Sequence, residues 1–175
     1  LVDWVAQKGG IPTISPTGHS LVKAKLRETK APFAGEMSGH LFFNDERWTG
    51  FDDGIYAALR LLEILSRSEN PSETLRSLPN AVNTPELQIP MEEGAPKRFI
   101  ERFSAGCRFD DAEHVITVDG VRVEWKDGFA LARSSNTTPV VVLRFEGDTP
   151  EALARIEKRF TEEMKRIDPS INIPA

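Results

Sequence analysis

Residues 115–145 contain four short β-prone segments joined by turns, and no other part of the chain limits the possible folds as much. The segments are residues 115–118, 121–125, 129–132 and 140–145. Asp119-Gly120, between the first two, is a dipeptide typical of two-residue hairpin turns. A polar run from Ser134 to Pro139 separates the last two. Because strands with short connections pair antiparallel, this stretch predicts an antiparallel sheet.

Two helices are predicted on either side of these strands. One covers residues 95–105, and the other begins after Thr149 with Pro150 at its first position. The apolar residues of the second helix recur at helical spacing; they are Leu153, Ile156, Phe160, Met164 and Ile167. With a further strand at 86–91, we expect an α+β domain over residues 84–175, in which four or five antiparallel strands carry both helices on one face.

The first half alternates strands with helices, which favours an α/β domain with a mixed sheet and flanking helices. The predicted elements are helices at 20–29 and 54–67 and strands at 31–35 and 41–43. An apolar stripe runs along the second helix; its members are Ile55, Ala58, Leu59, Leu62 and Leu65. Since we expect every such stripe to be covered within the fold, we expect a monomer.

Prolines and asparagines interrupt residues 68–85, and this segment predicts a domain boundary. We divide the chain into residues 1–83 and 84–175, with a hinge at 79–85. The chain opens on Leu1, within an apolar pattern that ends at Gly9-Gly10. That pattern looks like the last turns of a helix, so we expect a fragment whose first domain is truncated at its N-terminus.

Composition excludes some classes of function. The net charge of −5 argues against broad binding to nucleic acid or anionic lipid. The single cysteine, Cys107, excludes an internal disulfide and fits a reducing compartment, so we expect a cytoplasmic protein. No apolar run approaches the length of a membrane span. The histidines show no metal-ligand spacing, and we expect no metal site in this chain.

The polar run led by Arg133 has the chemistry of an anion site. A guanidinium offers a planar fork of donors that fits a phosphate. The hydroxyls of Ser135 and Thr137, the amide of Asn136 and the N–H groups of the turn could complete a concavity around it. An ordinary polar turn with one solvated arginine is the alternative.

Gly35-Glu36-Met37-Ser38-Gly39-His40 is a second unusual segment. Its glycines let the backbone turn and let a ligand approach closely. Glu36 could accept hydrogen bonds from two adjacent sugar hydroxyls, and Ser38 could add a third contact. Alternatively, Glu36 could cap a helix while Ser38 fills a tight turn.

His19, within Thr17-Gly18-His19-Ser20, is predicted at a helix N-terminus, where it could carry a proton or donate to a phosphate. It could equally be only a neighbour of the helix cap. Asp52-Asp53 is better explained by capping the following helix than by metal binding. His114 is expected on the surface.

Five motifs occur here in one order, and together they resemble the C-terminal half of the α-D-phosphohexomutases, specifically the phosphomannomutase/phosphoglucomutase type. They are Thr17-Gly18-His19-Ser20, Gly35 to His40, Trp48-x-Gly50-Phe51-Asp52-Asp53-Gly54, Asp119-Gly120-Val121-Arg122 and Arg133-x-Ser135-Asn136-Thr137-x-Pro139. The resemblance covers essentially the whole chain. It implies most of the family's third domain, followed by a fourth domain that resembles TATA-binding proteins.

The resemblance also implies roles for the loops. Glu36 and Ser38 would hold sugar hydroxyls, with His40 supporting that loop, and His19 would lie near the reacting end. Arg133, Ser135, Asn136 and Thr137 would grip the phosphate that is not transferred. The family interconverts hexose 1-phosphates and 6-phosphates of glucose or mannose, using a phosphoserine, Mg²⁺ and a 1,6-bisphosphate intermediate, with glucose 1,6-bisphosphate as activator.

The phosphoserine loop and the Mg²⁺ loop of such enzymes belong to domains that this chain does not contain. We therefore expect the fragment alone to be inactive and its partners to be hexose phosphates and the missing domains. Two other functions are open: a stand-alone phosphosugar-binding module, and a protein-interaction domain that uses the second sheet. The sequence does not rank glucose against mannose, because the two loops are expected to read positions other than the 2-hydroxyl.

Overall fold

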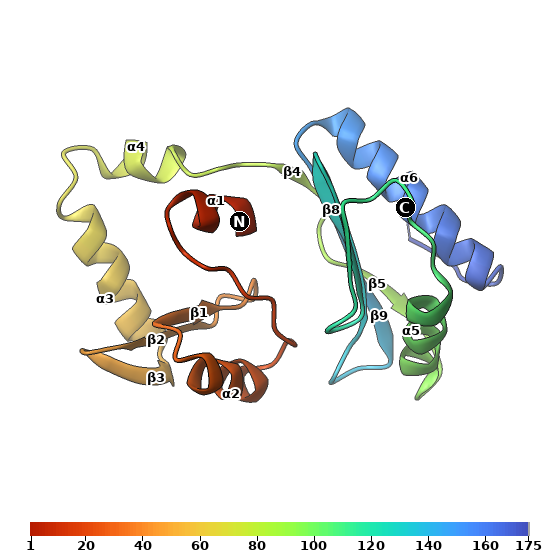
Figure 1. The fold of residues 1–175 in the computed structure, drawn as a ribbon, viewed down its shortest axis with the longest axis horizontal. Coiled ribbons are helices and arrows are strands. Elements are labelled where there is room, and N and C mark those ends of the chain that lie inside the picture. Colours follow the sequence, from red (N-terminus) through yellow and green to blue (C-terminus); the bar gives the residue numbers. More distant parts are fainter. Residues whose placement is uncertain (175) are drawn as a thin grey trace. The chain divides into compact units, whose positions relative to one another are not determined.

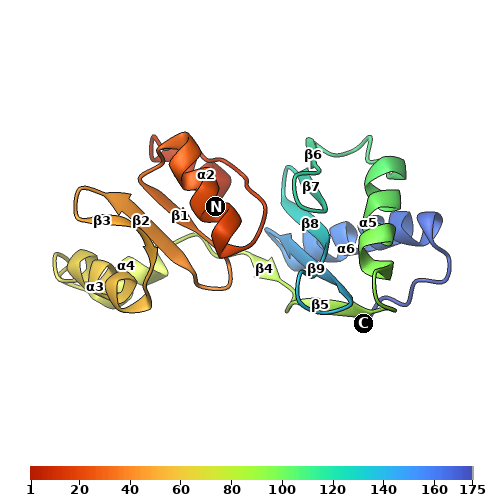
Figure 2. The same ribbon diagram turned by 90° about the horizontal axis from the view of Figure 1, so that it is seen from below.

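The chain folds into two compact units. The computed structural model describes residues 1–174, and the chain divides between unit 1, Leu1–Pro79, and unit 2, which begins at Asn80. This division lies just before the boundary that we placed between residues 83 and 84. Figures 1 and 2 show the order of the elements within each unit.

Unit 1 combines helices with a small antiparallel sheet. Its elements are α1 (Val2–Gln7), α2 (His19–Thr29), β1 (Phe33–Gly35), β2 (Leu41–Asp45), β3 (Trp48–Asp52), α3 (Gly54–Leu65) and α4 (Pro71–Arg76). The strands lie in the order β1-β2-β3, and both pairs are antiparallel. The predicted α/β class is confirmed, but the expectation of a mixed sheet is wrong. The connections between these strands are too short for the crossover that parallel pairing requires.

Strand β3 and helix α4 were not predicted. The side chain of Asn70 caps α4 by accepting the N–H of Glu73, and Pro71 occupies the first turn. A proline at that position costs no hydrogen bond, because the first N–H groups of a helix have no partner within it. The residues that we expected only to interrupt structure therefore also start a short helix.

Helix α3 is attached to the sheet along its polar side. Asp53 caps it, since one carboxylate oxygen accepts the N–H groups of Ile55 and Tyr56 at 2.9 and 3.0 Å. Arg60 donates to Asp45 at 2.6 Å. The ring of Tyr56 stacks on that of Trp48, with 4.1 Å between the centroids.

The apolar stripe of α3 is exposed. None of the α3 residues, all of which the structure describes, is buried. Ile55, Leu59 and Leu62 are 78%, 58% and 60% exposed. The core of unit 1 is formed instead by Val22 and Leu26 of α2 with Phe42 of β2. The premise of the monomer prediction, that every apolar stripe is covered, is therefore wrong for this unit.

Unit 2 is an antiparallel sheet with two helices. Its elements are β4 (Val82–Asn83), β5 (Leu87–Pro90), α5 (Ala95–Gly106), β6 (His114–Ile116), β7 (Val121–Trp125), β8 (Gly128–Ser134), β9 (Val140–Gly147) and α6 (Pro150–Ile167). In the described part of the chain the sheet has six strands, where we expected four or five. The path is β4-β9-β8-β7-β6, and β5 also pairs with β9. Since β4 is paired, Val82 and Asn83 of the predicted hinge belong to the sheet.

Both helices pack on one face of this sheet, as predicted (Figure 1). Thr149 caps α6 by accepting the N–H of Ala152 at 3.2 Å. Alternate residues of the central strands meet the helices in one buried cluster; those at its centre are Val121, Val123, Ala130, Ala132, Val141, Leu143, Phe145, Phe99, Phe103, Ile156 and Phe160. The Phe160 ring contacts those of Phe103, Phe109 and Phe145. Burying each valine, leucine, isoleucine or phenylalanine of this cluster stabilises the unit by roughly 1.5–3 kcal/mol.

The connection between β6 and β7 is longer than the predicted two-residue turn. The last pair is Ile116 with Arg122, and residues 117–120 lie between the end of β6 and the start of β7. Gly120 has a φ of +88°, which favours glycine because it has no β-carbon. Among the described residues, no helix has the length and apolarity needed to cross a membrane.

Candidate functional site

Arg133 is part of a strand. It pairs with Val142 near the end of β8, and Ser134 pairs with Val141, so β8 extends two residues beyond the predicted end at 132. Ala132 is buried on the helix-covered face, and neighbouring residues in a strand point to opposite faces. The Arg133 side chain therefore lies on the face of the sheet opposite the helices, where it is half-buried. Its backbone is fixed by the ladder.

Ser135 organises the loop that follows. Its Oγ accepts the N–H groups of Thr137 and Thr138 at 3.3 and 3.2 Å, and the Thr138 hydroxyl at 3.0 Å. Its own N–H donates to Val140 at 3.0 Å, where β9 begins. Asn136 and Thr137 are exposed at the tip. The loop thus holds its own shape and presents Asn136 and Thr137 to solvent beside the strand that carries Arg133.

The segment from Glu36 to His40 is a tight turn between β1 and β2. The N–H of Glu36 donates to the His40 carbonyl at 2.8 Å, and the N–H of Gly39 donates to the Glu36 carbonyl at 3.0 Å. Gly39 has a φ of +92°, as a three-residue hairpin loop requires. Ser38 is exposed at the tip. The alternative that Ser38 fills a tight turn agrees with this geometry, which also leaves its hydroxyl open to a ligand.

The two carboxylate oxygens of Glu36 have different surroundings. Oε2 accepts the N–H of Gly18 at 3.1 Å, and Gly18 is the residue that caps α2. Through Oε2, Glu36 therefore contacts the N-terminus of a helix, which agrees with the alternative that its side chain caps a helix. Oε1 is buried and accepts no hydrogen bond from any residue in 1–174. A buried carboxylate oxygen without a donor costs about 1–3 kcal/mol, so this position favours a ligand that brings one.

Glu36 also brings the two motifs of unit 1 together. Gly18 and Glu36 are far apart in sequence, and their contact joins the start of α2 to the β1–β2 turn. His19 is the first residue of α2 and is exposed. It therefore lies beside the turn that carries Glu36, Ser38 and His40.

Asp52 and Asp53 have separate tasks. Asp53 caps α3, as predicted for the pair. Asp52, at the end of β3, is 2.7 Å from Nδ1 of His40. Sequence reasoning missed this pairing, although both residues belong to the motifs of the family resemblance. His114 lies in β6 and is exposed, as expected.

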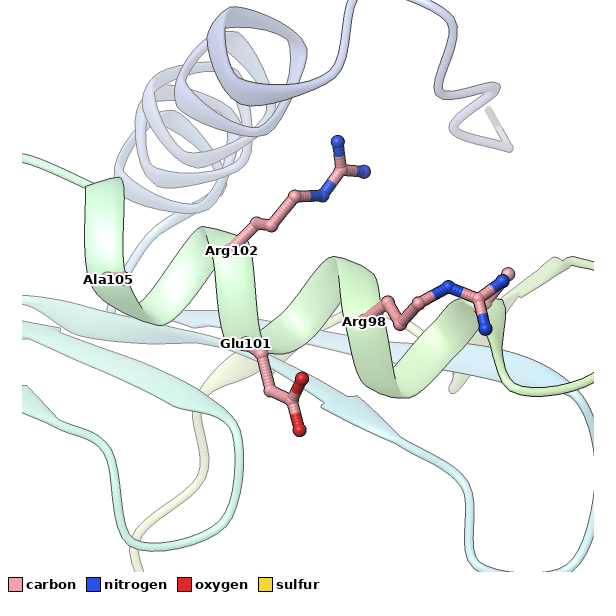
Figure 3. Close-up of a pocket in the computed structure, with 5 residues that line it drawn as sticks. Arg98, Glu101, Arg102 and Ala105 are labelled. Carbon is pink, nitrogen blue, oxygen red and sulfur yellow. The ribbon is translucent and has the colours of Figure 1, made fainter.

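Two further features of the described residues bear on ligand binding. No group of three or more His, Cys, Asp or Glu side chains within 1–174 is arranged to hold a metal ion. An open depression of about 740 Å³ lies along α5 and is lined by Ala95, Arg98, Glu101, Arg102 and Ala105 (Figure 3). It contains none of the candidate site residues, and Arg102 is paired with Asp168 at 2.9 Å.

Two family models match the chain in succession. Residues 1–82 match "Phosphoglucomutase/phosphomannomutase, alpha/beta/alpha domain III", and residues 82–163 match "Phosphoglucomutase/phosphomannomutase, C-terminal domain". The chain belongs to the phosphoglucomutase/phosphomannomutase family. The resemblance inferred from the five motifs is thereby confirmed.

Individual members of the phosphoglucomutase/phosphomannomutase family are also similar. A phosphoglucomutase of Neisseria gonorrhoeae is 53% identical over 161 residues, which are 91% of this chain and 35% of the relative. A phosphomannomutase/phosphoglucomutase of Pseudomonas aeruginosa is 47% identical over 175 residues, 99% of this chain and 37% of the relative. A crystal structure of a family protein from Burkholderia thailandensis superimposes with a TM-score of 0.91 at 57% identity, covering 99% of this chain and 36% of the other. The chain thus spans about a third of the length of these relatives.

Proposed function

We propose that this chain is the substrate-recognition part of a phosphohexomutase that interconverts hexose 1-phosphates and hexose 6-phosphates of glucose, mannose or both. The observation that carries the proposal is Oε1 of Glu36, a buried acceptor without a donor in a turn held by Gly18 on one side and Asp52 on the other. Sugar hydroxyls are suitable donors for it. Family membership supplies the reaction class.

Each unit recognises one part of the ligand in this proposal. In unit 1, Glu36, Ser38 and His40 bind sugar hydroxyls, and His19 lies beside them. In unit 2, Arg133, Ser135, Asn136 and Thr137 bind the phosphate that is not transferred. Arg133 supports this role because it is half-buried on the sheet face opposite the helices, while the Ser135 loop presents hydroxyl and amide groups next to it.

A phosphate clamp separate from a hydroxyl-binding turn suits a mutase. The 1-phosphate and the 6-phosphate must both bind, in opposite orientations, and a 1,6-bisphosphate must turn over between the two half-reactions. One clamp and one hydroxyl-binding turn can serve both orientations if they hold the groups that the two ligands share. These contacts act by positioning the substrate, which is a large part of catalysis in phosphoryl transfer.

The phosphoserine and the Mg²⁺ of the proposed reaction lie outside the described residues. The donor groups within 1–174 do not fit a metal ion, so no step at Mg²⁺ is assigned to this chain. We propose that the remaining domains of a longer enzyme supply both groups, and that these 175 residues alone do not catalyse the reaction. The exposed stripe on α3 supports a partner for unit 1. The single cysteine, Cys107, is consistent with a cytoplasmic location.

The test is an NMR titration of the chain with glucose 1-phosphate, inorganic phosphate and glucose. We expect the amides of residues 133–138 to shift with both phosphate ligands, and those of residues 35–40 to shift only with the sugar phosphate. Arg133→Ala should remove the response of the loop, whereas Arg98→Ala, on the outer surface of α5, should leave it unchanged. Equal responses in the wild type and in Arg133→Ala would contradict the proposal, as would interconversion of the two glucose phosphates by the purified chain.

A further inference from the structure

We propose that Asp52 is a positioning residue for His40: it holds the proton of the neutral imidazole on Nδ1, so that Nε2 is left as a hydrogen-bond acceptor for a ligand hydroxyl. The part of this inference that concerns the ligand rests on the proposed function. The part that concerns the imidazole depends only on the geometry of unit 1.

The contact between the two side chains is short and is built on fixed backbone. Nδ1 of His40 lies 2.7 Å from Oδ2 of Asp52. His40 immediately precedes β2, and Asp52 pairs with Phe42 across the β2–β3 ladder. Phe42 is fully buried in the core of unit 1. The separation between the imidazole and the carboxylate is therefore set by the sheet and by a core side chain.

The chemistry of the pair determines where the proton lies. An ionised carboxylate can only accept hydrogen bonds, so the nitrogen that faces it must carry a proton. A neutral imidazole has one N–H and one acceptor nitrogen, and the contact with Asp52 selects Nδ1 as the N–H. Free imidazole side chains favour the opposite tautomer. Asp52 thus imposes a state that His40 would not prefer alone.

The remaining nitrogen of His40 is available to a ligand. The contact with Asp52 uses only Nδ1, and the His40 side chain is 50% exposed, whereas that of Asp52 is 27% exposed. Nε2 and Oε1 of Glu36 are therefore two acceptors at opposite ends of one turn. Between them, the Ser38 hydroxyl can either donate or accept. Such a set favours a ligand with several neighbouring hydroxyl donors, and a ligand that lacks one leaves an acceptor unpaired.

The first experiment reads the tautomer directly. Long-range ¹H–¹⁵N spectra of the 175-residue chain, recorded at mildly alkaline pH, distinguish an imidazole protonated on Nδ1 from one protonated on Nε2. We expect Nδ1–H for His40 in the wild type. In Asp52→Asn the side-chain amide can donate to Nδ1, so we expect a shift to Nε2–H. Glu46→Gln, an exposed acid in the same hairpin, is the matched control and should change nothing.

A fold check separates positioning from unfolding. The resonances of Phe42 and Val22, in the core of unit 1, should be the same in Asp52→Asn and in the wild type. If Asp52→Asn disturbs them, Asp52→Glu provides a second variant, since it keeps the carboxylate and should retain Nδ1–H. Nε2–H in the wild type, or an unchanged tautomer in a folded Asp52→Asn variant, would overturn the inference.

The second experiment concerns the ligand. Loss of one oriented hydrogen bond should weaken binding of glucose 1-phosphate to Asp52→Asn by about tenfold, while binding of inorganic phosphate stays the same. Equal affinity of the two proteins for glucose 1-phosphate would refute the role of Nε2. If residues 35–40 of the wild type do not respond to glucose 1-phosphate, the proposed function of unit 1 fails, whereas the tautomer result still decides whether Asp52 positions His40.

Discussion

Gly120, in the β6–β7 connection, lies directly against the backbone of Arg133 in β8. A β-carbon at position 120 would be 2.7 Å from Cβ and 2.8 Å from Cα of Arg133, and 2.2 Å from the carbonyl oxygen of Ala132. No side chain fits there. Two motifs that are separate in the sequence thus meet in unit 2, and the absence of a side chain at Gly120 allows β8 to run where it places Arg133.

Replacing Gly120 with alanine should therefore destabilise unit 2. We expect Gly120→Ala to lower the free energy of unfolding by about 2–4 kcal/mol, because the clash with β8 adds to the strain of the positive φ. Gly94→Ala is the matched control. Gly94 also has a positive φ, of +73°, but its β-carbon would meet only the flexible end of Arg98. Urea denaturation followed by the NMR resonances of Phe103 and Phe160, in the core of unit 2, measures both, and equal losses would show that the close approach to β8 has no energetic effect.

Ser135 should control the affinity of unit 2 for phosphate more than its stability. Ser135→Ala removes the acceptor for the N–H groups of Thr137 and Thr138, so the loop loses the shape that it holds without a ligand. We expect the dissociation constant for inorganic phosphate to rise about tenfold, with a change in unfolding free energy within about 0.5 kcal/mol. Amide shifts of the loop give the affinity. Ser135→Thr keeps the hydroxyl and should restore binding; failure of this rescue would contradict the assigned role.

The apolar stripe of helix α3 should contribute little to the free energy of unfolding of unit 1. Leu59→Ala and Leu62→Ala remove side chains that are 58% and 60% exposed, and we expect each to change the free energy of unfolding by less than about 0.5 kcal/mol. Phe42→Ala, in the core of the same unit, should cost about 3–5 kcal/mol. The NMR resonances of Val22, in the core of unit 1, report on this unit during urea denaturation. A large loss in the leucine variants would mean that the stripe is covered in solution.

Glu163 should make unit 2 sensitive to acid. It is 6% exposed and accepts hydrogen bonds from Arg166 at 2.7 Å and from the N–H of Arg108 at 2.6 Å. The Arg166 hydrogen bond is the main cause that lowers the pKa of Glu163 below its ordinary value of 4.5. The unfolded chain therefore binds the proton first as the pH falls. The stabilisation by ionised Glu163 is fully present at pH values above 4.5, the ordinary pKa of the unfolded chain. It is lost as the pH falls through the lower pKa that Glu163 has in the folded protein.

Urea unfolding at a series of pH values tests this expectation. The slope of unfolding free energy against pH, below the ordinary glutamate pKa, should be smaller in Glu163→Gln than in the wild type. Glu162→Gln is the control, because that side chain is 60% exposed and its ion pair with Lys158 is long, with 4.0 Å between the two charged groups. Identical slopes in all three proteins would show that another carboxylate is responsible.

The sequence predicted unit 2 better than unit 1, for a physical reason. Thr149 with Pro150 marks a helix start by local chemistry, and the spacing of Ile156 and Phe160 shows which side of α6 is apolar; both predictions are confirmed. In α3 the same kind of spacing identified the apolar side, but periodicity does not reveal whether anything covers it. The prediction of an apolar stripe on α3 was therefore correct, whereas the prediction that other residues cover it was wrong.

The candidate site residues were chosen from the sequence by chemical type, and their contacts with one another were not predicted. The Gly18–Glu36 hydrogen bond depends on how α2 packs beside the β1–β2 turn, which no local pattern encodes. The His40–Asp52 pair depends on the β2–β3 register, and that register shifts between Phe42 and Asn44. A single-residue slip would have placed Asp52 on the other face of the sheet.

The short strand β4 has a mechanical consequence. The chain enters unit 2 through only two paired residues, Val82 with Gly147 and Asn83 with Glu146, and Thr84 adds two hydrogen bonds to Phe145. These attach to the far end of β9, whereas the loop organised by Ser135 joins the same strand at Val140. A pull on the chain at Asn80 would thus act first on the few hydrogen bonds of β4 and Thr84. These bonds can break while β8 and β9 stay paired, so that tension in the connecting chain leaves the position of Arg133 unchanged.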